Sequence, residues 1–282
     1  MQQGYYAFQL GDCRCVSVLD GGMEYELGEM VANFSRADVE AVLKSRNEPT
    51  DKIYTPYAYL FVDTGANRVV VDMGAGTLAP TTGKLLPNLR AAGIAPESVD
   101  SVFITHAHPD HIGGALDAQG QPIFPQATYY LSQTEWDFWF SEAGLASNSW
   151  MANLAREKLT PLKEKMVLIQ QEGEIIPGVS VLFAPGHTPG HMVVSFACGK
   201  EHLLYTGDTV LHPLHLEHPD WLPVFDILPD QAEGSKRRIF DLAASGDYWV
   251  LGQHFPPFPN LGHVLKTGGG WEWRPVDMIS GV

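Results

Sequence analysis

The stretch Thr105-His106-Ala107-His108-Pro109-Asp110-His111 carries four side chains that can bind a metal, and it constrains the fold more than any other part of the chain. It directly follows the apolar run Ser101-Val102-Phe103-Ile104 and is itself followed by Gly113-Gly114. This pattern is typical of a buried strand that ends in a loop, and we expect a helix to begin near Ile112. Imidazole and carboxylate groups suit zinc and other first-row metals. The sequence therefore predicts a metal site at the end of a buried strand.

The direction of the side chains indicates two metal ions rather than one. In an extended chain alternate side chains share a side, so His106 and His108 face the same way. Asp110 and His111 lie at the turn into the expected helix and can face a second ion. The alternative, a chance group of surface histidines, does not explain the strand-loop-helix context.

Three further segments have the same arrangement, in which an apolar run leads to a residue that can bind a metal. They are 181–191, 204–209 and 249–254, and they contain His187, Asp208 and His254. Seven candidate ligands thus follow four expected strands.

With these residues the chain resembles the metallo-β-lactamase-fold hydrolases, from about residue 57 to residue 263. The signature of that family is His-x-His-x-Asp-His, followed by a lone His, a lone Asp and a last His. The resemblance implies an α+β fold, a four-layer αβ/βα sandwich of two mixed sheets flanked by helices, in a single domain over residues 1–282. It also implies the ligand sets. The first metal would be held by His106, His108 and His187, the second by Asp110, His111 and His254, and Asp208 would bridge both.

Single residues that differ from those of known family members indicate which branch of the family this chain resembles. Asp208 stands where the best-known lactam-cleaving zinc enzymes have Cys, and Asp110 stands where diiron flavoproteins have Glu. Segments 207–221 and 254–263 resemble the methyl parathion hydrolase-like and lactonase-like branches. The well-known acyl-homoserine lactonases place a Tyr three residues after the bridging Asp, whereas this chain has Leu211. That phenol is therefore missing, and His212 could replace it only in part.

These observations predict a dinuclear metal-dependent hydrolase. A hydroxide that bridges two metals would attack a small neutral, hydrophobic substrate: a lactone such as an acyl-homoserine lactone, a carboxylic ester or an organophosphate triester. Asp110, Asp208 and His212 are the expected catalytic residues, with Asp110 passing a proton to the leaving group. The expected cofactors are two divalent ions, zinc first, with Mn²⁺, Co²⁺ or Fe²⁺ as alternatives.

Two other functions remain open. One is a mononuclear-iron persulfide dioxygenase of similar fold, and the other is a non-catalytic metal-binding relative. The complete set of ligands for a second metal argues against both.

Two segments are expected to surround the substrate. Residues 23–55 show little periodicity and predict an irregular cover or an oligomer contact, which leaves a homodimer open. Residues 133–165 predict a helical insertion near the mouth of the active site. Within and beyond it, five aromatic side chains are candidates for the pocket, with the hydrophobic core as the alternative for the first three. They are Trp136, Trp139, Phe140, Trp221 and Phe255.

The net charge limits the possible binding partners, and the cysteines indicate the cellular compartment. With 33 acidic and 18 basic residues the net charge is −15, which argues against nucleic acids and anionic membranes as partners. The expected partner is a small-molecule substrate. Cys13, Cys15 and Cys198 are an odd number, and two cysteines two residues apart on a strand are poorly placed for a disulfide. We therefore expect reduced, buried thiols and a cytoplasmic protein.

The remaining expectations concern the secondary structure and the other histidines. Strands are expected at 57–62, 68–72, 99–105, 128–132, 166–170, 179–184, 191–197, 203–206 and 248–252, and helices at 85–92, 149–163 and 231–244. Two further strands within 4–20 are expected to close at Asp20-Gly21-Gly22. No ligand role is expected for His191, His202, His215, His218 or His263.

Overall fold

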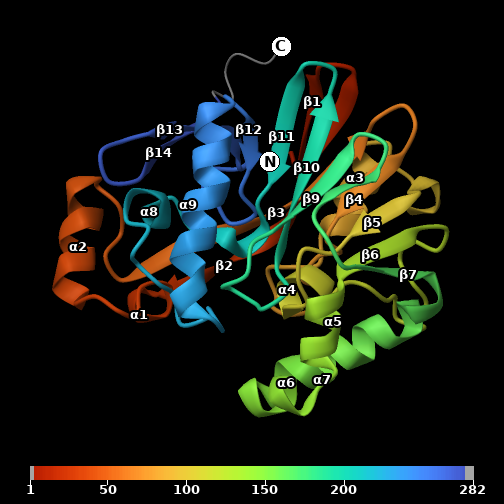
Figure 1. The fold of residues 1–282 in the computed structure, drawn as a ribbon, viewed down its shortest axis with the longest axis horizontal. Helices are drawn as coiled ribbons and strands as arrows, with labels where there is room; N and C mark the ends of the chain where they lie inside the picture. Colours follow the sequence, from red (N-terminus) through yellow and green to blue (C-terminus); the bar gives the residue numbers. More distant parts are fainter. Residues whose placement is uncertain (1–2, 277–282) are drawn as a thin grey trace.

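The computed structural model describes residues 3–276 and contains two seven-stranded sheets that pack face to face. Helices cover the two outer faces, so the predicted four-layer sandwich is confirmed (Figure 1). The first sheet has the strand order β1 to β7, and the second has the order β14-β13-β12-β11-β10-β9-β8.

The first sheet comes from the N-terminal part of the chain, up to Ile169. Strands β1 to β4 pair antiparallel, whereas β4 to β7 pair parallel. Parallel neighbours need crossover connections, and the helices of these crossovers cover the outer face. The strands are β1 Tyr5–Leu10, β2 Cys13–Glu26, β3 Lys52–Asp63, β4 Arg68–Val71, β5 Ser101–Phe103, β6 Thr128–Ser132 and β7 Met166–Ile169. The helices are α3 Leu85–Ala91, α4 Pro109–Ile112, α5 Gln133–Trp139, α6 Glu142–Ser147 and α7 Ser149–Leu159, and Figure 1 shows α5 to α7 grouped below the sheets.

The second sheet comes from the second half. Only β11 and β12 pair parallel, and the connection between them contains α8 Leu214–Glu217 and α9 Pro229–Ser245. Ile239, Phe240 and Ala243 of α9 are buried in the cluster that covers this sheet. The strands are β8 Gly173–Ile176, β9 Val179–Phe183, β10 Met192–Cys198, β11 Glu201–Tyr205, β12 Trp249–Leu251, β13 Leu261–Lys266 and β14 Trp271–Pro275.

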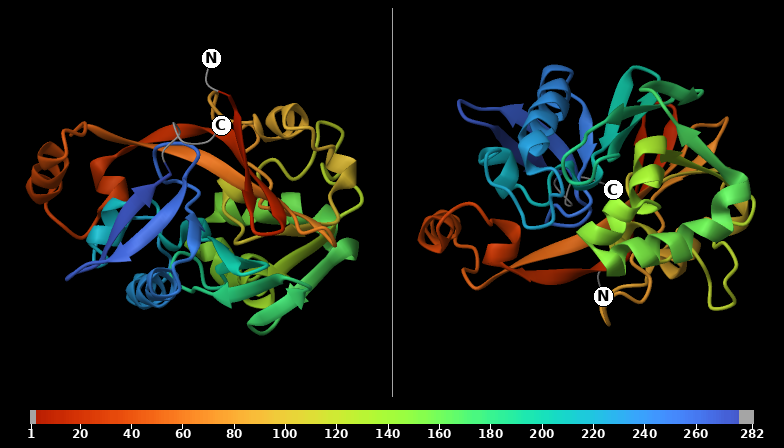
Figure 2. Two further views of the ribbon diagram at one scale, coloured as in Figure 1. Left: turned by 90° about the horizontal axis from the view of Figure 1, so that it is seen from above. Right: turned by 60° about the horizontal axis from the view of Figure 1, so that its bottom comes forward.

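Residues 23–55 are more regular than predicted. β2 continues through Gly21 and Gly22 with a bulge and pairs with β3 as far as Glu26 opposite Lys52. Between these strands lie α1 Leu27–Met30 and α2 Arg36–Ser45, and the Ser35 hydroxyl accepts a hydrogen bond from Asp38 N as an N-cap. The long β2–β3 hairpin therefore carries both helices to one side of the molecule (Figure 2). Sequence periodicity missed it because the strands pass from a two-sided core into a half-exposed arm.

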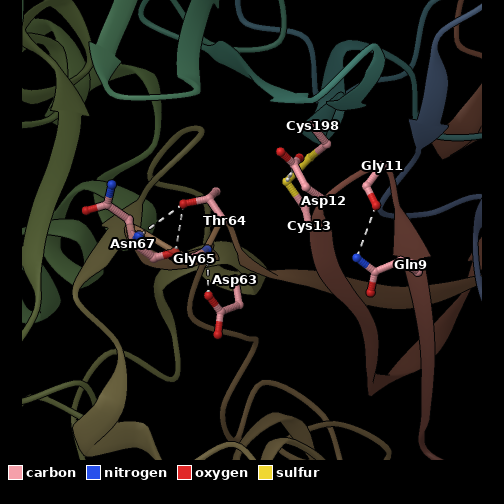
Figure 3. Close-up of a disulfide and its surroundings, with 9 residues drawn as sticks. All are labelled: Gln9, Gly11, Asp12, Cys13, Asp63, Thr64, Gly65, Asn67 and Cys198. Carbon is pink, nitrogen blue, oxygen red and sulfur yellow. Dashed lines mark hydrogen bonds between the residues drawn. A yellow bond between two sulfur atoms is a disulfide. The ribbon is translucent and has the colours of Figure 1, made fainter.

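The prediction of three reduced cysteines is wrong. Cys13 at the start of β2 forms a disulfide with Cys198 at the end of β10, while Cys15 is free and buried (Figure 3). The bond therefore joins the two sheets. Sequence reasoning considered only neighbouring cysteines, whereas these two partners are 185 residues apart. The argument from reduced thiols to the cytoplasm no longer holds, because disulfides are typical of oxidising compartments.

The bond lies beside two tight turns (Figure 3). Between β1 and β2, Gln9 Nε2 donates to the Gly11 carbonyl at 3.2 Å. Between β3 and β4, Gly65 N donates to Asp63 Oδ1 at 2.9 Å and Asn67 N donates to Thr64 Oγ1 at 3.0 Å.

Within residues 3–276, no helix has the length and apolar character needed to cross a membrane.

Candidate metal centre

All seven candidate ligands meet at one edge of the sandwich. In the second sheet β9, β11 and β12 run in the same direction, so their carboxyl ends lie at a common edge. His187, Asp208 and His254 follow these ends. The loop after β5 of the first sheet brings its three histidines and Asp110 to the same place, and the helix there begins at Pro109 rather than near Ile112.

The structure arranges the ligands as two groups that share Asp208. One group is His106, His108, His187 and Asp208, and the other is Asp110, His111, Asp208 and His254. Within each group the ligand atoms lie within 4.8 Å of one another. These are the two sets that the family resemblance implies.

Asp208 turns a different oxygen toward each group. Its Oδ2 lies 3.2 Å from His187 Nε2 and 3.8 Å from His106 Nε2. Its Oδ1 lies 3.2 Å from His111 Nε2 and 3.2 Å from His254 Nε2. Asp110 Oδ2 completes the second group at 3.3 Å from His254 Nε2. A carboxylate with this placement can bind two cations at once.

The donor atoms fit divalent cations. His106 Nε2, His111 Nε2 and Asp208 Oδ1 are buried and have no hydrogen-bond partner within the described chain. Buried polar atoms are normally paired, so unpaired atoms within both ligand groups indicate ligands there. Burial lowers the pKa of His106 and of His108 well below the usual value, which keeps both imidazoles neutral and able to coordinate. Mixed nitrogen and oxygen donors suit zinc and neighbouring metals.

Asp72 holds His111 in place. Its Oδ2 lies 2.7 Å from His111 Nδ1, and both of its oxygens accept hydrogen bonds from Thr105, one from the amide and one from the hydroxyl, each at 2.8 Å. Asp72 directly follows β4 and has a φ of +62°. Its position after a strand, like that of the ligands, was the signal that sequence reasoning missed.

Glu135 at the start of α5 connects two ligand loops. Its Oε1 accepts from Ala107 N at 3.0 Å, between the first two histidines. Its Oε2 accepts from the Thr188 hydroxyl at 2.6 Å and from Gly190 N at 3.0 Å, just beyond His187. A Cβ on Gly190 would lie 2.1 Å from Glu135 N, so only glycine allows this approach.

Two more residues orient ligands. Asp226 Oδ1 lies 3.0 Å from His187 Nδ1, which fixes the ring so that Nε2 faces Asp208. His191 Nε2 accepts a hydrogen bond from Asp208 N at 3.0 Å. No sequence signal marked Asp226, because it lies in a loop outside the ligand motifs.

A cavity of about 170 Å³ opens above both groups. Its wall is mainly apolar and comes from the β2–β3 hairpin, from the start of α7 and from the loops after β4 and β11. The lining includes Met23, Tyr25, Met30, Thr55, Tyr57, Leu78, Trp150, Met151, Leu211 and Phe225, together with His108, Asp110, His187, Asp208 and His254. We call it the metal-site pocket.

None of the five predicted pocket aromatics is among its lining residues. Trp139 is fully buried, and its Nε1 donates to Glu135 Oε1 at 2.7 Å. Trp136 stacks on Phe140 and packs against the hydrophobic cluster that contains Trp139. Trp221 packs against His218 and Phe34, and the buried Phe255 packs against Trp273. The structure therefore supports the core alternative for Trp139 and gives none of the five a place in the lining of this pocket, because aromatic content alone does not show which side chains are buried.

His212 is also outside the metal-site pocket. It is buried, its Nδ1 accepts a hydrogen bond from Leu214 N at 3.3 Å, and it borders a separate cavity beside α2. Burial, together with Arg46 and His254, lowers its pKa to about 3. The expected catalytic role of His212 therefore has no support in this geometry. Among the other histidines, His191, His202, His215, His218 and His263 belong to neither ligand group.

Comparisons with known proteins agree with this geometry. The family profile described as "Metallo-beta-lactamase superfamily" matches residues 54–254. An N-acyl homoserine lactonase of Bacillus thuringiensis is 30% identical over 146 residues, which is 47% of this chain and 51% of that protein. The chain thus spans about half the length of the curated relatives it matches.

Two solved structures match nearly the whole chain. A structure of AidC, described as a dizinc quorum-quenching lactonase in complex with a product, is 28% identical with a TM-score of 0.90, and the match covers 98% of each chain. The hydrolase AbOPH, described as in the beta-lactamase superfamily, is 27% identical with a TM-score of 0.91, and the match covers 99% of each chain.

Proposed function

Because this chain belongs to the metallo-β-lactamase superfamily, we propose that it is a dinuclear metal-dependent hydrolase of small, neutral, hydrophobic esters, with acyl-homoserine lactones as its first substrate class. One observation carries the proposal. Asp208 presents one oxygen to each of two complete ligand groups at the base of an apolar pocket. The lactonases among the relatives and neighbours support the substrate class.

Two divalent cations held by these groups would supply a water of lowered pKa and a positive contact for a carbonyl oxygen. The chain's own residues prepare the site. Asp72 and Asp226 fix the orientation of His111 and His187, and Glu135 holds the loops that carry the first group. Asp110 lines the pocket, and we propose that its carboxylate takes a proton from the attacking water and passes it to the leaving oxygen of the ester.

The wall of the pocket favours an uncharged acyl group. Met30, Met151 and Leu211 offer flexible apolar surface, and Trp150 and Phe225 offer aromatic surface. Charged side chains reach the pocket only at the metal centre, among its lining residues. Away from the metal centre, the residues that line the pocket wall offer no positive charge to a phosphate monoester. An acyl chain would bury apolar area against the same wall.

A substrate panel on zinc-reconstituted protein tests the proposal. Acyl-homoserine lactones, aryl esters and organophosphate triesters would be compared by kcat/KM, and we expect lactones to give the highest value. His254→Ala should abolish activity, whereas His263→Ala, on β13 outside both ligand groups, should retain it. Failure of fully metallated protein to cleave any of the three classes would overturn the proposal.

A further inference from the structure

The wall that the β2–β3 hairpin contributes to the metal-site pocket carries three hydroxyl groups. Tyr25 of β2 and Thr55 and Tyr57 of β3 all line the pocket. Met23 pairs with Thr55, Tyr25 with Ile53 and Gly21 with Tyr57, so these side chains share one face of the hairpin. Met23, Tyr25, Thr55 and Tyr57 of this face reach the metal-site pocket.

The two phenols contact each other, and one of their two hydroxyl hydrogens is not used in that contact. Tyr25 Oη and Tyr57 Oη form a hydrogen bond, and neither has another hydrogen-bond partner within the described residues. Two hydroxyl groups carry two hydrogens, and their mutual bond uses only one. Whichever phenol accepts that bond keeps a hydrogen that can be donated into the pocket.

Thr55 is an independent sign that a polar ligand belongs here. Its side chain is 1% exposed, and its Oγ1 has no hydrogen-bond partner within the described part of the chain. A buried hydroxyl without a partner costs about 1–3 kcal/mol, so such groups usually face a ligand or a water. The unpaired hydroxyl lies in the same wall as the phenol pair.

The phenol pair also lies close to the reacting centre. The Tyr57 ring packs edge-on against the His254 ring, with centroids 4.9 Å apart. Leu211, three residues after Asp208, lines the same pocket but has no polar side-chain atom. The hairpin is thus the source of neutral hydroxyl donors among the residues that line this pocket.

We propose that the Tyr25–Tyr57 pair donates a hydrogen bond to the ester oxygen that gains negative charge during hydrolysis, with Thr55 contacting a second polar atom of the substrate. This inference rests on the proposed function. A preorganised donor aimed at developing charge stabilises the transition state more than the ground state. Loss of the donor should therefore lower kcat more than it changes KM.

Tyr→Phe variants test the pair. In Tyr25→Phe or Tyr57→Phe one hydroxyl remains and can still donate, so kcat should fall modestly. In the double variant kcat should fall about 100-fold, the order expected for loss of one such donor. Tyr54→Phe is the matched control, because Tyr54 lies on the same strand but is 52% exposed and does not line the pocket. Metal content and melting temperature should match the wild type in all four variants.

A rescue variant separates a donor role from a purely structural one. Leu211→Tyr places a phenol in the same pocket from another element and should restore kcat of the double Phe variant at least tenfold. A double Phe variant with wild-type kcat, or a loss of activity accompanied by a loss of metal, would overturn the inference. Wild-type protein that cleaves no ester would instead refute the proposed function.

Discussion

At the scale of single residues, Asp208 is the position on which both ligand groups depend. It is 4% exposed, and each of its oxygens lies 3.2 Å from a histidine nitrogen of a different group. In Asp208→Asn a neutral amide replaces the charge shared by two cations, and one end of the amide is a donor. We expect metal content and kcat to fall together, measured by metal analysis and lactone hydrolysis.

Asp230→Asn in the first turn of α9 is the control, since it removes the same charge at an exposed position. Full metal occupancy with an unchanged rate in Asp208→Asn would contradict a bridging role.

A second prediction for a single residue concerns Glu135 and the affinity for metal. Its carboxylate accepts hydrogen bonds from Ala107 N, Thr188 Oγ1, Gly190 N and Trp139 Nε1. In Glu135→Gln one end of the side chain becomes a donor and would face donors. We expect metal affinity to fall about 10–100-fold, the usual effect of losing a residue that orients metal ligands. Glu142→Gln on α6 is the exposed control. Unaltered affinity in a competition titration with a chelator would show that Glu135 only supports the core.

The ligands themselves could be predicted from the sequence, whereas their supporting residues could not. Each ligand motif directly follows an apolar run, and the common direction of β9, β11 and β12 turns that local pattern into a shared site. Asp226 and Glu135 reach the site through tertiary packing, and no local pattern shows which loop or helix will lie beside a histidine. Tyr25 and Tyr57 were missed for the same reason, since their meeting depends on the register of the hairpin.

At the scale of elements, α5 and α7 make different contributions to the metal-site pocket. Trp139 of α5 is fully buried, whereas Trp150 of α7 is 54% exposed and lines the metal-site pocket. Trp139→Ala should lower the free energy of unfolding by about 3–5 kcal/mol, as truncation of a buried aromatic does. Trp150→Ala should leave stability nearly unchanged and raise KM for a long-chain lactone. Denaturant unfolding and steady-state kinetics on both variants check this, and equal destabilisation of the two would contradict it.

The elements that the sequence did not reveal are either partly buried or very short. β8, β13 and β14 lie at or near one edge or the other of the second sheet, and their burial is partial, so they lack the continuous apolar runs of β10 or β11. The helix α1 has only four residues, too few for a periodic pattern. The part of β3 from Tyr57 onward, β9, β10 and the helices α3, α7 and α9 were predictable because each buries an apolar face, whereas the half-exposed arm of β2 and β3 was not.

At the scale of the whole molecule, the disulfide and the metal centre both connect the two sheets. Cys13–Cys198 closes a loop of 185 residues between β2 and β10. A cross-link of this span restricts the unfolded chain, and its removal should lower the free energy of unfolding by about 2–5 kcal/mol. Cys13→Ser with Cys198→Ser tests this against Cys15→Ala, which leaves the bond intact. Metal content should not change, because the bond lies outside both ligand groups. Equal stability of the wild type in reducing and oxidising buffer would contradict the prediction.

The metal centre joins the sheets by a second route. The first sheet contributes the loop after β5, and the second contributes the ends of β9, β11 and β12. Buried hydrogen bonds accompany it: Tyr205 Oη donates to Gln253 Oε1 at 2.8 Å, and Ala58 N of β3 donates to the Gln253 carbonyl at 3.0 Å. Cations that bind only the folded chain stabilise it in proportion to the logarithm of their concentration over Kd.

Exhaustive chelation should therefore abolish hydrolysis and lower the melting temperature together. Zinc, manganese or cobalt should restore both, to different extents, because mixed nitrogen and oxygen ligands discriminate weakly among first-row metals. Metal analysis of the restored protein should give two ions per chain, whereas one iron per chain in the protein before chelation would favour the persulfide dioxygenase alternative. His254→Ala should respond to chelation with a smaller fall in melting temperature than the wild type, since the second group has already lost a ligand. Activity that survives verified removal of metal would contradict the role we propose for these seven residues.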